Sequence, residues 1–333
     1  MEKIDLLVLY PCEKTVLNSM DKISSYNEMR SFFLHESIEK IKSKKTHVVH
    51  ACLSEFWHKK SKEKFDKLTT ELAHQEIDVA TVNNMIFCTI GGYKSFRGDS
   101  KQKLIDTVKG KTLKLDDYEV RLAGHNRLCT VGHFQKGYCD PEEFLLGGLT
   151  VASHVFVPKQ NFSDRILRIH VDHNFQDRET VFEKIKEILY EIESKIKNHC
   201  FWKDLEIYYH SQKESIERLG HFNFTNIPLS SLANLYGSCH VGFMSHRETL
   251  GQYPLELLSC GANVIGDPVN HLPKEVSEQF AITDINNFSI DEVIDPEYIE
   301  RNIMINREKV LKFDFDNYSK KIFNFIGLPT SEK

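Results

Sequence analysis

Two glutamates with a fixed spacing, Glu248 and Glu256, are the residues of this sequence best suited to chemistry. Seven residues separate them, and Pro254 lies between them at a place suited to the first position of a helix. Glu248 then belongs to the loop that leaves a strand expected over 240–244, and Glu256 belongs to the first turn of the next helix. Free backbone N–H groups and the helix dipole favour a phosphate there. The pattern predicts two carboxylates that flank a phosphate-binding helix N-terminus; the alternative is an acidic loop and an exposed helical glutamate.

The segment 245–261 resembles the E-x7-E motif of the retaining, nucleotide-sugar-dependent glycosyltransferases with the GT-B fold, the glycosyltransferase group 1 family. A helix-like segment over 232–236 precedes the motif and a strand-like segment over 261–266 follows it, in the order typical of the family. The resemblance implies that Glu248 faces the donor sugar and stabilises its oxocarbenium-like character. It also implies that Glu256 accepts hydrogen bonds from the ribose hydroxyls.

The donor diphosphate needs partners of its own, because negative charge accumulates on the leaving nucleoside diphosphate. The family's usual arginine and lysine pairs, near the first β–α connection of the C-terminal domain, have no equivalents within 170–178. We therefore take Arg178 as the first candidate cation, His173 as the second and Arg247 as the third; the alternatives are surface ion pairs and a structural histidine. The resemblance also implies that three backbone amides hold the sugar hydroxyls and the diphosphate, those of Thr249, Leu250 and Gly251.

A histidine in the first half of the chain is the second catalytic candidate. The strand expected over 119–123 ends at Gly124 and His125. Many relatives carry a histidine near the donor sugar at such a strand end, so the resemblance favours His125, with His133 behind it; the alternative is a histidine that packs locally. The family's glycine-rich turn after the first strand is missing, because residues 10–14 contain no glycine.

Strand-like and helix-like segments alternate along the chain, which indicates parallel sheets built from βαβ units. A helix over 181–197 has the clearest pattern, since its apolar residues recur mostly three or four positions apart. Two further helices are expected within 296–326, with a break near 313–314. Strands are expected at 4–10, 46–52, 77–82, 85–90, 119–123, 152–157, 165–171, 205–209, 240–244 and 262–265, and other helices at 55–75, 144–149, 229–236 and 254–260.

These elements lead us to expect an α/β protein of GT-B architecture, with two facing Rossmann-like, doubly wound domains and a C-terminal helical tail. Residues 1–158 form the N-terminal acceptor domain in this interpretation, and residues 165–295 form the nucleotide-sugar-binding domain. Residues 296–333 form the tail, which packs back on the N-terminal domain. Ligands of such folds bind at the carboxyl ends of the parallel strands.

Composition and charge argue against several classes of protein. With 41% hydrophobic and 27% charged residues, the chain is typical of a globular protein with a large core. We expect a cytoplasmic protein, because the N-terminus lacks a signal-peptide layout and no apolar run approaches the roughly 20 residues of a membrane span. The first 158 residues carry 23 basic and 21 acidic side chains, too even a balance for a nucleic-acid partner. The lysines within 40–45 and 59–64 suit a peripheral contact with anionic lipids at the inner membrane face; the alternative, solvated helix faces, is the more common role of such lysines.

Metal and cofactor sites are not expected. The eight cysteines contain no C-x-x-C pair and the 16 histidines no H-E-x-x-H pattern, so we expect free thiols. The resemblance agrees, because GT-B enzymes generally neutralise the diphosphate with helix dipoles and side chains. The nucleotide sugar is then a substrate, and no cofactor is implied.

The function predicted on these grounds is transfer of a sugar, with retention, from a nucleotide sugar to a hydroxyl of a glycan or glycolipid acceptor, in surface polysaccharide or glycolipid assembly. One alternative is a phage-type DNA glycosyltransferase, which the sequence pI of about 6.4 weighs against. A second is a nucleotide-sugar epimerase of the same fold, which needs acid and base groups near the sugar carbons. A third is a non-catalytic protein that binds nucleotide sugars.

Overall fold

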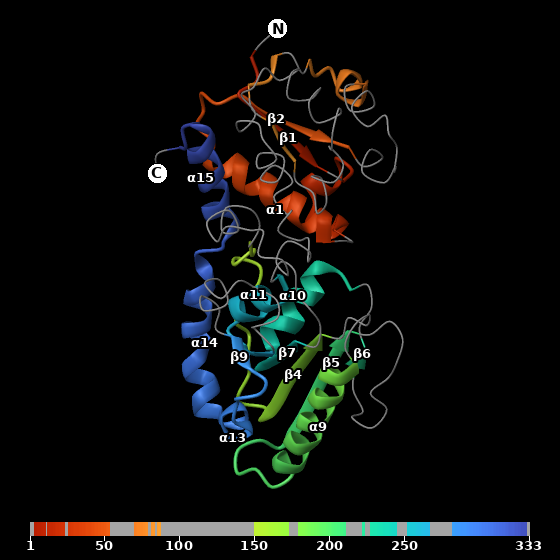
Figure 1. Ribbon diagram of the computed structural model, residues 1–333, viewed down its shortest axis with the longest axis vertical. Helices are drawn as coiled ribbons and strands as arrows, with labels where there is room; N and C mark the ends of the chain where they lie inside the picture. Colours follow the sequence, from red (N-terminus) through yellow and green to blue (C-terminus); the bar gives the residue numbers. More distant parts are fainter. Residues whose placement is uncertain are drawn as a thin grey trace. The chain divides into compact units, whose positions relative to one another are not determined.

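A computed structural model of the chain consists of two compact units (Figure 1). The first unit comprises Met1–Leu149 and Phe315–Lys333, and the second comprises Thr150–Asp314. The structure describes residues 3–10, 12–23, 26–53, 70–78, 81–83, 85–87, 150–172, 179–210, 222–223, 227–244, 252–266 and 282–331.

The described part of the first unit contains a parallel sheet with the strand order β2-β1-β3. β1 (Leu6–Tyr10) is an unbroken apolar run with every residue buried, as is typical of a strand covered on both faces. β2 (Val48–Cys52) and β3 (Met85–Phe87) pair with β1 on either side. Tyr10 lies opposite Cys52, so β1 and β2 end at the same edge of the sheet.

Two helices that are distant in sequence pack together in the first unit (Figure 1). They are α1 (Tyr26–Ile41) and α15 (Phe315–Ile326). The rings of Phe33 and Phe315 have centroids 5.7 Å apart, and the Ser37 hydroxyl donates a 2.9 Å hydrogen bond to the Phe315 carbonyl. Two short 3-10 helices, η1 (Val16–Asn18) and η2 (Met20–Lys22), lie between β1 and α1 in the sequence.

The second unit contains a parallel sheet in the order β6-β5-β4-β7-β8-β9 among its described residues. This is the strand order of the Rossmann fold, in which the chain starts at the centre, fills one side and then returns to fill the other. The topological switch point lies between β4 and β7. The strands are β4 (Ile166–Asp172), β5 (Asp204–His210), β6 (Phe222–Asn223), β7 (Val241–Met244), β8 (Asn263–Gly266) and β9 (Ile282–Asp284).

The described helices of the second unit lie where the sequence predicted them, except for a short unpredicted helix over 290–294. α9 (Glu179–Ile196) packs on β5 through a buried apolar face that includes Ile185, Leu189 and Ile192 (Figure 1). Its bounds confirm the helix predicted over 181–197. The other described helices are α10 (Leu229–Ser238), α11 (Gln252–Ser259), α13 (Ile290–Ile294) and α14 (Pro296–Leu311).

The C-terminal stretch is divided between the two units. α14 begins with Pro296 after the cap residue Asp295, whose carboxylate accepts a 3.0 Å hydrogen bond from the Glu297 N–H, and it packs on α11. α15 belongs to the first unit. Both helices were predicted, together with the break between them near 313–314.

The segment 77–82, predicted to be a strand, is not one in its described residues. The Thr81 N–H donates a 3.0 Å hydrogen bond to the Asp78 carbonyl. Val82 pairs only in an isolated bridge with Ile4. Its β-branched and apolar residues favoured a strand, but the Thr81 N–H bonds within the segment instead of to a neighbouring strand.

The strand predicted over 152–157 is also wrong. The Phe156 N–H donates a 3.0 Å hydrogen bond back to the Ala152 carbonyl, so the chain turns there. The Phe156 carbonyl accepts hydrogen bonds from the Ser259 hydroxyl, at 2.8 Å, and from Arg307 Nη1, at 3.0 Å. Side chains from other elements therefore provide hydrogen-bond donors for the Phe156 carbonyl in this turn. The predicted strand at 119–123, the helix at 144–149 and most of the helix at 55–75 lie outside the described residues.

Candidate functional site

The carboxyl ends of β4 and β7 lie side by side at the switch point of the second unit. Asp172 and Met244, their last residues, are partners in the parallel ladder. In doubly wound sheets, ligands bind outside the strand ends at this point. The segments that follow these two strands, 173–178 and 245–251, contain most of the predicted site.

Only one of the predicted site residues, Glu256, is among the residues that the structure describes. The others lie outside them: His125, His133, His173, Arg178, Arg247, Glu248, Thr249, Leu250 and Gly251.

Glu256 lies one turn deeper in its helix than the sequence predicted. α11 begins at Gln252, so Glu256 belongs to the second turn, and Pro254 is the third helical residue rather than the first. Proline is tolerated there because N–H groups of the first turn have no acceptor within the helix. The free N–H groups at the start of the helix, which we expected to bind phosphate, therefore lie further from Glu256 than predicted.

The Glu256 side chain is buried, with 1% of its surface exposed. Its charge contributes to the raised pKa of Tyr236, for which burial is the first cause, and it also contributes to the raised pKa of Cys260 after burial and Cys239. Burial of a carboxylate is costly unless other groups satisfy it. Glu256 is therefore not the exposed helical glutamate of the alternative interpretation.

A close approach of backbone and side chain positions α11 against the sheet. Gly242 of β7 faces Leu257 of α11, and a Cβ atom added at residue 242 would lie 2.3 Å from Leu257 Cδ1. Leu257 is fully buried. Glycine at this position lets α11 lie directly over the strand that ends at the switch point.

A Schellman motif ends the same helix. The Gly261 N–H donates to the Leu258 carbonyl at 2.9 Å, and the Ala262 N–H donates to the Leu257 carbonyl at 3.0 Å. Gly261 has a φ of +85°, a conformation that residues with a side chain adopt only with strain. The Asn306 side chain of α14 donates a 3.1 Å hydrogen bond to the Ala262 carbonyl. These contacts fix the C-terminal end of α11 and confirm the predicted stop at residues 260–261.

Three buried polar rings, which the sequence interpretation missed, join α10 and α11 to β4. They belong to His170, Tyr236 and Tyr253. His170 Nδ1 lies 2.9 Å from the Tyr253 hydroxyl, and the His170 and Tyr236 ring centroids are 4.9 Å apart. Burial raises the pKa of both tyrosines well above the ordinary value, and the Asp172 carboxylate raises each further, so both phenols stay neutral. Tyr253 lies inside the motif segment, but nothing in that segment indicated a polar partner on β4.

Within the described ranges, no helix is long and apolar enough to cross a membrane.

Comparison with solved structures identifies the architecture. AviGT4, a glycosyltransferase involved in avilamycin A biosynthesis, matches with a TM-score of 0.51 at 9% identity, over 97% of both chains. Sucrose-phosphate synthase from Thermosynechococcus elongatus matches with a TM-score of 0.50 at 11% identity, over 97% of this chain and 98% of its own. The fold is GT-B. At these identities the likeness establishes the α/β fold that the sequence predicted. No family model and no curated protein matches the chain.

Proposed function

We propose that the protein is a retaining glycosyltransferase that moves a sugar from a nucleotide-sugar donor to an acceptor hydroxyl. One observation carries the proposal. The buried carboxylate of Glu256 lies on the helix that follows β7, one of the two strands at the switch point of a Rossmann sheet. The helix is fixed at its C-terminal end, which suits a group that must hold a ligand in one geometry.

The residues of the motif have separate roles in this proposal. Glu256 accepts hydrogen bonds from the donor ribose, and Glu248 stabilises positive charge on the sugar as the glycosidic bond breaks. The backbone amides of Thr249, Leu250 and Gly251 hold the sugar hydroxyls and the diphosphate. Three further side chains are the candidate diphosphate contacts, in the order Arg178, His173 and Arg247.

The burial of Glu256 sets a condition on this mechanism. Its side chain is 1% exposed, so a ribose can reach the carboxylate only if the side chains around it rearrange when the donor binds. Substrate-induced rearrangement is common in transferases, which exclude water from the reacting sugar in this way. If no rearrangement occurs, Glu256 is a structural residue.

The acceptor is assigned to the first unit, as a glycan or a glycolipid, with His125 as the residue that approaches the donor sugar. A lipid-linked acceptor agrees with the lysines at 40–45 and 59–64, which we propose to contact anionic lipid at the membrane surface. The reaction needs no resident metal in this proposal, and activity should therefore persist in EDTA.

A donor panel tests the proposal. The purified protein is melted with UDP-, GDP-, ADP- and dTDP-linked sugars and CMP-linked sugars, and a donor selective for the folded state raises the melting temperature. The stabilising donor is then incubated with the protein, and the products are separated. Release of free sugar, with its configuration at the anomeric carbon retained, supports a transferase that uses water as a slow acceptor. Recovery of an epimerised nucleotide sugar, or no stabilisation by any donor, contradicts it.

A further inference from the structure

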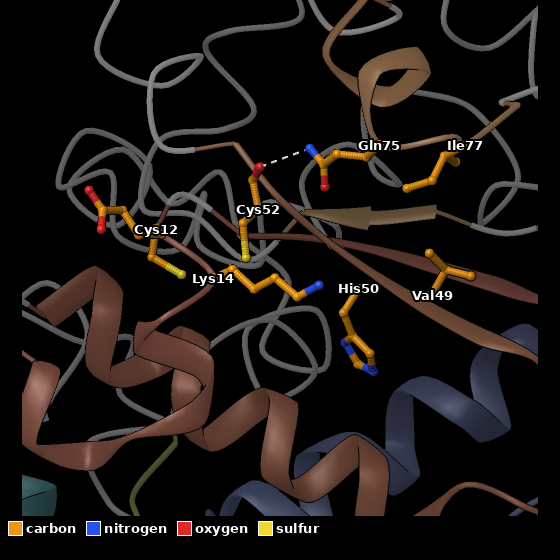
Figure 2. A pocket seen from close by; sticks show the side chains of 8 residues that line it. Cys12, Lys14, Val49, His50, Cys52, Gln75 and Ile77 are labelled. Carbon is orange, nitrogen blue, oxygen red and sulfur yellow. Dashed lines mark hydrogen bonds between the residues drawn. The ribbon is translucent and has the colours of Figure 1, made fainter.

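A pocket of about 560 Å³ lies in the first unit, along β2 and at the edge where β1 and β2 end (Figure 2). Two thiols line it. Cys12 follows β1 by two residues and Cys52 is the last residue of β2. The remaining lining residues are Glu13, Lys14, Val49, His50, Gln75 and Ile77.

The sheet register brings these two cysteines together. Tyr10 and Cys52 are partners in the parallel ladder, and the Leu53 N–H donates a 2.8 Å hydrogen bond to the Tyr10 carbonyl. Cys12 lies two residues beyond Tyr10 and lines the same pocket as Cys52, and Figure 2 shows the two sulfur atoms close to each other. In Figure 2 both sulfur atoms lie near the Lys14 side chain. The two thiols therefore lie near each other at one edge of the sheet, although 39 residues separate them in the sequence.

The two thiols differ in access. Cys12 is 2% exposed, whereas Cys52 is partly exposed to the pocket. The hydrogen bond with Cys12 and the positive charge of Lys14 lower the pKa of the Cys52 thiol, against the opposing effect of burial. A thiol with more thiolate and an open approach attacks first, and a buried neighbour in contact with it resolves the product.

We propose that Cys12 and Cys52 form a reversible disulfide in this pocket, by exchange with a small-molecule disulfide such as oxidised glutathione. The Cys52 thiolate attacks one sulfur of oxidised glutathione, whose S–S bond breaks, and the first glutathione leaves with the proton that Cys52 released. Cys12 then loses its proton and attacks the Cys52 sulfur, which releases the second glutathione. Two protein thiols are oxidised and one glutathione disulfide is reduced to two thiols.

The disulfide has a structural consequence. It ties the chain after β1 to the end of β2 and so constrains the pocket wall that contains Glu13 and Lys14. Because the exchange runs in both directions, the pocket has an open dithiol form and a constrained disulfide form. This inference does not depend on the proposed transferase activity.

Peptide mapping of the intact chain tests the proposal. Reduced protein is incubated with oxidised glutathione, the remaining thiols are alkylated in acid, and the digest is analysed without reduction. We expect a linked peptide that contains Cys12 and Cys52, lighter by two hydrogen atoms than the two thiol peptides together, and lost on treatment with dithiothreitol. The exposed Cys200 serves as an internal control, because it should carry a glutathione adduct instead.

Two substitutions separate the steps. Cys12→Ser should leave a stable glutathione adduct on Cys52, because no thiol resolves it, and Cys52→Ser should leave Cys12 as an unmodified thiol. The proposal is overturned if wild-type Cys12 and Cys52 both stay alkylatable while Cys200 is modified. It is also overturned if wild-type Cys52 keeps a glutathione adduct while Cys12 remains a thiol. The wild-type measurement needs no variant, so a folding defect in a variant does not affect the result.

Discussion

The Tyr253 hydroxyl of α11 lies 2.9 Å from Nδ1 of His170 on β4, so a buried hydrogen bond joins the helix of Glu256 to the first strand of the second unit. The same hydroxyl lies 3.3 Å from the carbonyl oxygens of His170 and Phe243. The hydroxyl thus connects the helix to both strands of the switch point, β4 and β7.

Tyr253→Phe tests this connection. The ring keeps its packing, but the buried His170 Nδ1 loses its hydroxyl partner, so we expect the free energy of unfolding of the second unit to fall by about 1–3 kcal/mol. Urea denaturation measures this change. Tyr190→Phe is the matched control, because Tyr190 is 38% exposed on α9. Identical unfolding curves for Tyr253→Phe and the control would show that the hydrogen bond contributes nothing.

The contact between Gly242 and Leu257 gives a second prediction. Gly242→Ala adds a methyl group at 2.3 Å from Leu257 Cδ1, and the overpacking should destabilise the second unit by about 1–3 kcal/mol. In a Leu257→Ala background the same substitution should cost less, because the obstructing methyl group is gone. A double-mutant cycle measures this coupling. Additive effects of the two substitutions would exclude the steric explanation.

The buried His240 should make the stability of the second unit depend on pH. Burial, and then the charge of Arg168, lowers the pKa of His240 to about 4, from an ordinary value of 6.5. Between these values the unfolded chain binds a proton that the folded chain does not, so stability falls as the pH decreases from about 6.5 to about 4. The expected loss between pH 7 and pH 5 is about 2 kcal/mol.

His240→Asn provides the test of that pH dependence. Its side-chain oxygen can replace His240 Nδ1, which accepts a 3.0 Å hydrogen bond from the Arg168 N–H, but it does not titrate. Urea unfolding at the two pH values is followed by the fluorescence of Trp202, whose ring is 5.2 Å from His240, in a Trp57→Phe background. The variant should lose less stability than its parent at pH 5. An equal loss in both proteins would assign the pH dependence to other groups.

The sequence predicted the central strands of the second unit closely. Each described strand from β4 to β8, apart from the two-residue β6, begins and ends within about two residues of its prediction, because apolar runs alternate there with amphipathic helices. The segments 77–82 and 152–157 were misassigned because they contain strand-forming residues. In the second segment, the distant side chains of Ser259 and Arg307 donate hydrogen bonds to the Phe156 carbonyl. Such tertiary hydrogen bonds leave no periodic signal in the sequence.

The site was predicted less completely than the fold. The motif indicated Glu256 and its helix, but the helix start was placed two residues late, since proline drew the prediction to the first position. His170 was read as one residue of an apolar strand, and its pairing with Tyr253 joins residues 83 positions apart. The proximity of Cys12 and Cys52 was missed for the same reason, because strand register and not local spacing creates it.

Glu248→Gln addresses the chemical step of the proposed reaction. The neutral amide no longer stabilises positive charge on the sugar, so kcat should fall by about 100-fold or more, while the affinity for the nucleoside diphosphate changes by less than about threefold. Steady-state kinetics on the donor found in the panel, together with calorimetric titration of the diphosphate, measure both quantities. Near-normal turnover would remove Glu248 from the mechanism.

Glu256 is tested most directly by calorimetric titration of the donor's nucleoside diphosphate into Glu256→Gln and Glu256→Ala, with Glu187→Gln on the exposed face of α9 as the control. Thermal melts run in parallel confirm that each variant is folded. If the carboxylate binds ribose, loss of its charge-assisted hydrogen bonds should weaken the diphosphate and the intact donor by the same factor, about tenfold or more, and the control should bind normally. Folded Glu256 variants with unchanged affinity for both ligands would contradict the account and leave Glu256 as a structural residue.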